Sequence, residues 1–234
     1  MNTVGLALAE ALHLIAGGDA KLVAIVALSL RVSATSIVVG TLVAMPLGAL
    51  LAVTSFRGQR AAIVTLNALL GLPSVVVGLA VYLLLSRAGP LGSFGILFTP
   101  AAMVIAQAIL VLPLIAALTR QAISDAWQET REQLRSLGAG PFASATALLW
   151  DLRFSLVTIV LAGFGRAVSE VGAVMIVGGN IDGVTRVMTT AIALETSKGD
   201  LPLALGLGFV LLAIVLALNV VAHLTREAVQ RHHG

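Results

Sequence analysis

Hydrophobic and polar positions in this chain are grouped into long blocks. Runs that are free or nearly free of charged residues recur, and each is close to the roughly 20 residues that a helix needs to cross a bilayer. This pattern predicts five membrane-spanning helices. They are expected at residues 32–53, 61–85, 97–118, 154–177 and 201–224. The sequence therefore indicates an all-α, polytopic membrane protein.

The segments outside these spans are short. Residues 1–21 have apolar positions at helical spacing but too few of them to span, so we expect an N-terminal amphipathic helix in the membrane plane. Residues 184–194 predict a short helix against the outer face. We accordingly treat residues 22–225 as one transmembrane domain and residues 226–234 as a tail.

One long polar interval, residues 120–153, separates the third and fourth spans and carries both tryptophans, Trp127 and Trp150. Its charge pattern predicts a helix at residues 124–137. Residues 138–141, Gly-Ala-Gly-Pro, then end that helix, and Pro141 suits the first turn of a second helix at residues 142–149. Two interpretations remain open: a solvated helical hairpin, or an element on which a partner protein docks.

Composition narrows the class of protein. The chain has 234 residues, of which 59% are hydrophobic and 11% charged, and this excludes an ordinary soluble globular domain. The absence of cysteine excludes disulfides, thiolate metal sites and thiol catalysis. The net charge of +3 is spread among apolar segments, so we expect no nucleic-acid binding.

Basic residues set the expected orientation, because cytoplasmic loops of membrane proteins are enriched in Lys and Arg. If the N-terminus lies outside, the inner loops and tail hold Arg57, Arg60, Arg120, Arg131, Arg135, Arg153, Arg226 and Arg231. The outer side then holds Lys21, Arg87, Arg186 and Lys198. We therefore expect the N-terminus outside, and both the polar interval and the C-terminus in the cytoplasm.

Two stretches carry a family resemblance. Glu132 and Gly138 match in spacing the EAA loop of ABC-importer permeases, although Gln133 and Leu134 replace its two alanines. The end of that motif is lost, since Leu148, Trp150 and Asp151 stand where Ile, Leu and Pro are expected. The more specific match lies in residues 163–181 and 185–196, including Ser-Glu-Val-Gly at 169–172. These residues are similar to the ABC permeases for molybdate, sulfate and especially tungstate, and the similarity covers about residues 28–224.

The resemblance implies a type I ABC-importer permease fold in the cytoplasmic (inner) membrane, and a homodimer. It implies an ABC ATPase dimer on the cytoplasmic face and an extracytoplasmic oxyanion-binding protein. The chain would be a transport subunit and not an enzyme, with no cofactor or metal of its own, because ATP and Mg would bind the ATPase. The residues expected to couple to the ATPase are Glu132, Gly138, Ala139, Pro141, Phe142 and Ser144.

The fourth span also contains an ionisable pair. Arg166 and Glu170 lie four residues apart, so they share a helix face and can form an ion pair near the middle of the membrane. A charge there is unfavourable against lipid, so neither side chain should face lipid. Either the pair fastens helices together, or Arg166 offsets the charge of a passing oxyanion. The residues expected at the translocation path are Arg166, Ser169, Glu170, Gly172 and Asn180.

Other functions fit less well. Neither of the two lysines follows a phosphate-binding glycine loop, so ATP chemistry belongs to a partner. An intramembrane enzyme would need a nucleophile with its base, or a metal cluster, at membrane depth, whereas the four histidines lie at or beyond span ends. A stand-alone secondary transporter remains an alternative, although no internal repeat is recognisable. Molybdate and sulfate remain alternatives to tungstate.

Overall fold

The computed structural model describes residue 5, residue 17 and residues 20–233, with side chains as far as residue 220. Every regular element within this part is helical, as the sequence predicted. The in-plane helix expected within residues 1–21 lies outside the described residues, as do the side chains of the tail.

The two longest internal helices form the centre of the structure. They are α2, Ala20–Val53, and α5, Pro100–Ser136. They run in the same direction, since Ser36 of α2 meets Gln107 of α5, and further along both helices Gly48 lies against Ala116. A Cβ on Gly48 would overlap the backbone carbonyl oxygen of Ala116, so glycine permits this close approach.

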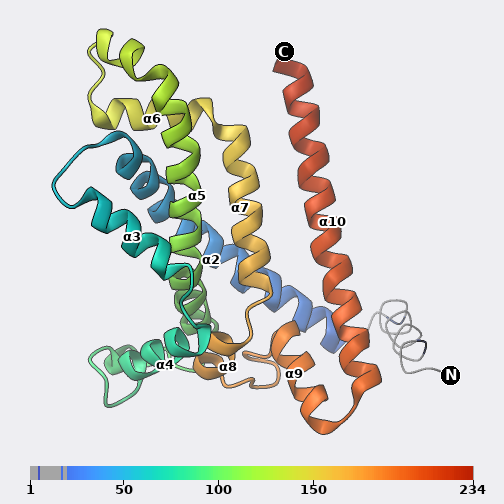
Figure 1. Ribbon diagram of the computed structural model, residues 1–234. Helices are drawn as coiled ribbons and strands as arrows, with labels where there is room; N and C mark the ends of the chain where they lie inside the picture. Colours follow the sequence, from blue (N-terminus) through green and yellow to red (C-terminus); the bar gives the residue numbers. More distant parts are fainter. Residues whose placement is uncertain (1–4, 6–16, 18–19, 234) are drawn as a thin grey trace.

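A third helix, α7 (Arg153–Val168), packs on this central pair. Its Gly163 lies against the side chains of Ile115 on α5 and Ile37 on α2. Figure 1 shows α5 and α7 side by side with α2 crossing them obliquely.

The short helices α4, α8 and α9 form one end of the molecule, as Figure 1 shows along its lower side. Helix α3 leads into α4, and the α4–α5 connection contains η1. Helices α8 and α9 follow α7. Their bounds are Gln59–Leu69 (α3), Ser74–Leu85 (α4), Gly92–Phe94 (η1), Gly172–Gly178 (α8) and Met188–Lys198 (α9). Helices α4 and α8 are in close contact, since a Cβ on Gly78 would come within 2.7 Å of the Ala173 Cα.

The opposite end carries α6 (Pro141–Asp151), and α10 (Leu201–His233) extends towards this end. The expected helix at residues 142–149 is therefore confirmed. The first part of α10 packs with the α9 helix and the start of α2, through a cluster of Leu22, Met188, Ala191, Leu207 and Val210.

Three described helices are long and apolar enough to cross a membrane, namely α2, α5 and α10. The number rises to five if each of two bent pairs, α3 with α4 and α6 with α7, counts as one span. This range includes the five spans expected from the sequence.

Two expected spans are wrong as continuous helices. Residues 61–85 form α3 and α4, which meet at 100° beside Pro73. Proline has no N–H to donate and disfavours helical geometry in the residue before it, which explains a break there. The span expected at residues 154–177 ends at Val168, and α8 begins only at Gly172.

Other helices are longer than predicted or are shifted along the chain. Helix α5 joins the expected third span and the expected helix at residues 124–137 into one element of 37 residues. Helix α2 begins at Ala20, twelve residues before the expected span. The short outer helix expected at residues 184–194 is shifted to Met188–Lys198, because the chain from Ile181 to Arg186 forms a turn.

Candidate functional site

The break between α7 and α8 is organised by the carboxylate of Glu170, whose side chain is only 4% exposed. One oxygen, Oε2, lies 2.6 Å from Nη1 of Arg166. The other, Oε1, accepts a hydrogen bond of 3.1 Å from the backbone N–H of Ala173, in the first turn of α8. The hydroxyl of Ser74, in the first turn of α4, lies beside this carboxylate. The buried charge is thus met by one cation, one backbone N–H and a neighbouring hydroxyl, as a buried charge requires.

The backbone of Glu170 is equally engaged. Its carbonyl oxygen accepts a 2.8 Å hydrogen bond from the hydroxyl of Thr189 on α9, and its N–H donates to the carbonyl of Ala167. Gly172 leaves room for these contacts, since a Cβ there would come within 2.8 Å of the Ser74 hydroxyl. One residue therefore connects α4, α7, α8 and α9.

Arg166 occupies the last turn of α7 and its side chain is 38% exposed. The ion pair expected with Glu170 is confirmed, but it forms across the end of a helix and not within one. The fixed carboxylate holds Nη1, and the partly exposed guanidinium still reaches the surface of the single chain. Arg166 thus makes a structural contact with Glu170 and also presents part of its positive charge at the surface of the single chain.

A buried amide fixes the backbone beside Arg166. Gln107 of α5 is 4% exposed; its Nε2 donates to the carbonyl of Ala167 at 2.9 Å, and its Oε1 lies 3.1 Å from the hydroxyl of Ser36 on α2. The three central helices α2, α5 and α7 thus share one hydrogen-bonded chain of polar groups. In the sequence, this hydrogen-bonded chain is indicated only by Gln107, a single amide side chain within an apolar segment.

The remaining expected residues of the translocation path divide into two places. Ser169 is exposed, and its hydroxyl donates to the carbonyl of Arg166. Asn180 lies beyond the far end of α8, in left-handed backbone geometry with φ of 50°. Its Oδ1 lies 3.4 Å from Nε of Arg186, which also pairs with Asp182. The structure brings Arg166, Ser169, Glu170 and Gly172 together and leaves Asn180 apart.

Sequence reasoning missed Ser74 and Thr189. Ser74 lies in a segment far from Glu170 along the chain, and Thr189, although it lies within the matched stretch 185–196, has no local pattern that ties it to Glu170. Only the folding of α4 and α9 towards the α7–α8 break brings them to it.

The second expected site is the corner between α5 and α6. Gly138 has φ of 74°, its N–H donates to the carbonyl of Arg135, and the N–H of Ala139 donates to that of Leu134. This pair of bonds is the Schellman arrangement that ends helices at a left-handed glycine. Pro141 then occupies the first turn of α6, as expected.

Helix α6 has one buried and one exposed face. Phe142 is 74% exposed and Ala143 is exposed, and Glu132, near the end of α5, is exposed as well. Ser144 is fully buried, and Ala145 packs against α2. Ser144 therefore faces the core of the single chain, because one face of α6 must be buried for the helix to be held in place, and its expected part in coupling to an ATPase stays a prediction.

No cluster of three or more His, Asp or Glu side chains that could hold a metal ion occurs among the described residues.

Comparisons with known proteins relate the whole chain to a single group. It is 43% identical over 217 residues to the tungstate uptake system permease protein TupB of Peptoclostridium acidaminophilum, covering 93% of this chain and 95% of that protein. It is 38% identical over 214 residues to TupB of Campylobacter jejuni, covering 92% and 90%. It is also 38% identical over 218 residues to a probable anion ABC transporter permease protein of Haloferax volcanii, covering 91% and 94%. Sulfate and molybdenum transport permeases are similar at 27–29% identity. No family model matches the chain.

Replacing Glu170 by Gln should lower the free energy of unfolding by about 2–3 kcal/mol, because it removes a half-buried ion pair and the charge that the neighbouring helices are arranged to stabilise. Thermal unfolding of the purified protein in detergent measures the change. Asp182→Asn is the matched control, since its carboxylate is 61% exposed and pairs with Arg186 at the surface. That variant should change the stability by less than about 1 kcal/mol. Equal effects of the two substitutions would contradict the central role of Glu170.

Proposed function

The chain belongs to the permease subunits of ABC-type anion importers, and from that premise we propose that it forms, as a homodimer, the channel through which tungstate crosses the membrane. It is a multi-pass membrane protein, and ATP hydrolysis takes place in a separate subunit because permease subunits of this family lack ATPase activity. An ATPase and a binding protein are accordingly its partners.

Sequence identity supports tungstate as the transported anion. The two tungstate permeases are 43% and 38% identical to the chain, whereas the molybdenum and sulfate permeases are 27–29% identical. Tungstate, molybdate and sulfate share a tetrahedral shape and a double negative charge, so molybdate and sulfate stay as alternatives.

The exposed face of α6 is the observation that supports coupling to an ATPase most directly. The helix stands at one end of the molecule, its inner face buried against α2 and its Phe142 side chain 74% exposed. An exposed aromatic residue on a short, firmly held helix suits insertion into a groove of a partner. We assign the contact with an ATPase dimer to Glu132, Gly138, Ala139, Pro141 and Phe142, and we assign to Ser144 the fixing of α6 on the core.

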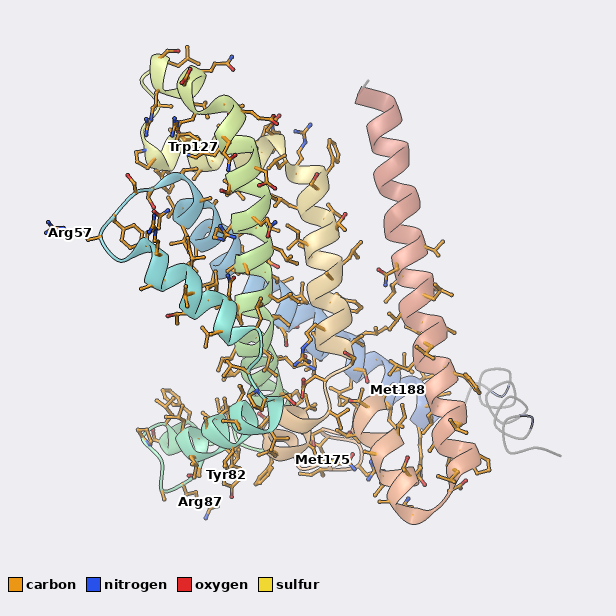
Figure 2. All side chains as sticks on the ribbon, viewed as in Figure 1. Arg57, Tyr82, Arg87, Trp127, Met175 and Met188 are labelled. Atoms are coloured by element: carbon orange, nitrogen blue, oxygen red, sulfur yellow. The ribbon has the colours of Figure 1, made fainter. Side chains whose placement is uncertain are left out.

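Charge placement supports a cytoplasmic position for α6. Figure 2 has Arg57 and Trp127 at one end of the molecule and Arg87, Met175 and Met188 at the other. Most loop arginines fall at the α6 end, as the positive-inside tendency favours for a cytoplasmic face. The N-terminus of α2 would then lie outside and the end of α10 inside the cell. The binding protein would approach the end formed by α4, α8 and α9.

We assign Arg166 to the translocation path. In a homodimer two copies of its partly exposed guanidinium would face a shared axis, where they would offset the charge of an oxyanion in a medium that screens weakly. Glu170 would position Arg166, and its fixed negative charge would keep the anion from binding too tightly. No cofactor is proposed for this chain.

The proposed substrate is tested by measuring how much tungsten cells accumulate. Cells that lack their own tungstate uptake and express the chain with its ATPase and binding protein should accumulate tungsten. Excess molybdate or sulfate should compete weakly. Preferential accumulation of molybdenum or sulfur under the same conditions would reject tungstate in favour of that anion.

Gly138→Val should separate ATP hydrolysis from uptake. A β-branched residue in left-handed geometry costs on the order of 1–2 kcal/mol, so the α5–α6 corner should change shape. No atom lies within 4 Å of a Cβ built there, so the backbone alone would cause the effect. Gly138→Asn is the control, because asparagine tolerates this geometry. Hydrolysis with reduced uptake is expected for the valine variant only, and normal uptake in that variant would reject the coupling role.

Arg166→Ala should lower the uptake rate by about tenfold or more, the effect of losing about 1.4 kcal/mol of favourable interaction with the anion. Loss of the ion pair lowers the stability, as in the Glu170 variant, but the dimer should still assemble, because Glu170 keeps the hydrogen bond from the Ala173 N–H. Uptake assays together with cross-linking of the dimer separate the two effects. Loss of the dimer in this variant would indicate that the residue only fastens helices.

A further inference from the structure

Two neighbouring cavities follow the first half of α2 and share Leu28. The larger, about 260 Å³, is lined by Arg31 and Thr35 of α2 and by Pro100, Ala101 and Val104 at the start of α5. The smaller, about 170 Å³, contains Lys21, Asp182 and Arg186. We call the two together the α2 groove.

The larger cavity, which forms the inner part of the groove, contains Arg31, whose charge is not neutralised by any acidic side chain of the described residues. Arg31 is exposed, and no carboxylate of the described residues lies within 4.0 Å of its guanidinium. Arg186, in the outer cavity, differs in this respect, because it pairs with Asp182 at 3.0 Å. An anion entering the inner cavity would therefore meet an unneutralised positive charge.

The position of Arg31 along the membrane normal follows from α5. The apolar part of α5 runs from Pro100 to Thr119, about 30 Å at 1.5 Å per residue, which matches the thickness of the hydrocarbon layer. Pro100 therefore marks one edge of that layer. Because Arg31 and Pro100 line the same cavity, Arg31 lies near the depth of lipid headgroups.

Below Arg31 and Thr35 the exposed face of α2 is entirely apolar. Val38, Val39, Leu42, Val43 and Leu47 are each 45–71% exposed. Their helical spacing continues the face that carries Arg31 and Thr35. A cation above an uninterrupted apolar stripe is complementary to a phospholipid, whose anionic headgroup would meet the cation while its acyl chains lie along the stripe.

We propose that the α2 groove binds an anionic phospholipid of the leaflet on the α4, α8 and α9 side, with the phosphate on Arg31 and an acyl chain along Val39 and Leu42. This inference goes beyond the proposed transport of an oxyanion. A transported oxyanion has no use for the apolar stripe. Ile37, which faces α7, is six residues or about 1.7 turns from Arg31, so Arg31 lies on a different side of α2 from the side that meets α7.

Native mass spectrometry of the intact transporter, permease with ATPase, tests this binding in separate titrations with phosphatidylglycerol and phosphatidylcholine. The anionic lipid should bind more tightly. Arg31→Gln should weaken phosphatidylglycerol binding by about fivefold, the usual effect of one basic residue at a membrane surface. Arg87→Gln is the matched control, an exposed arginine at the same end but outside the groove, and should leave binding unchanged.

A second variant and a competition experiment test the lipid site independently of Arg31→Gln. Ala101→Phe should fill the inner cavity and reduce phosphatidylglycerol binding without removing any charge, which provides a second variant if Arg31→Gln does not fold. Sodium tungstate at millimolar concentration should not displace the lipid. Unchanged lipid binding in both groove variants, or displacement of the lipid by tungstate, would overturn the proposal, and the second result would identify the groove as a site for the transported anion. The lipid titrations of the two groove variants do not depend on which anion the channel carries.

Discussion

The break in helical structure between α7 and α8 is the constraint on which one end of the molecule depends. A helix that stops within a membrane domain leaves N–H and C=O groups that lipid cannot satisfy. Glu170 resolves this locally: its carboxylate accepts the N–H of Ala173, its carbonyl accepts the Thr189 hydroxyl, and its own N–H donates to Ala167. Since these groups belong to α7, α8 and α9, and Ser74 adds α4, the solution to a local problem also fixes the packing of four helices.

Local patterns predicted much of this structure correctly. Apolar run length indicated an all-helical membrane protein, the Gly-Ala-Gly-Pro sequence predicted the corner before α6, and the four-residue spacing predicted the pairing of Arg166 with Glu170. Each of these depends on residues that are close together in the chain. The family resemblance in residues 163–196 was likewise carried by a contiguous stretch, and the similarity of the whole chain to tungstate permeases agrees with it.

The features that could not be predicted from the sequence depend on contacts between residues that are far apart in the chain. An apolar segment has the same composition whether it crosses the membrane or lies across one end of a bundle, so the 100° bend between α3 and α4 was not apparent. Ser144 was expected to couple to an ATPase, and because small residues carry no signal of burial the sequence did not show that it faces the core of the single chain. Ser74 and Thr189 became part of the Glu170 site only through tertiary packing.

The continuity of α5 has a mechanical consequence. Helix α5 has 37 residues and is about 55 Å long, with Pro113 as the point at which it bends most readily. Gln107, the eighth residue of α5, bonds to the carbonyl of Ala167, next to Arg166, and the α6 corner is attached to the other end of the same helix. A displacement of the α6 corner is thus passed along one continuous helix to the neighbourhood of Arg166, without any flexible linker between them.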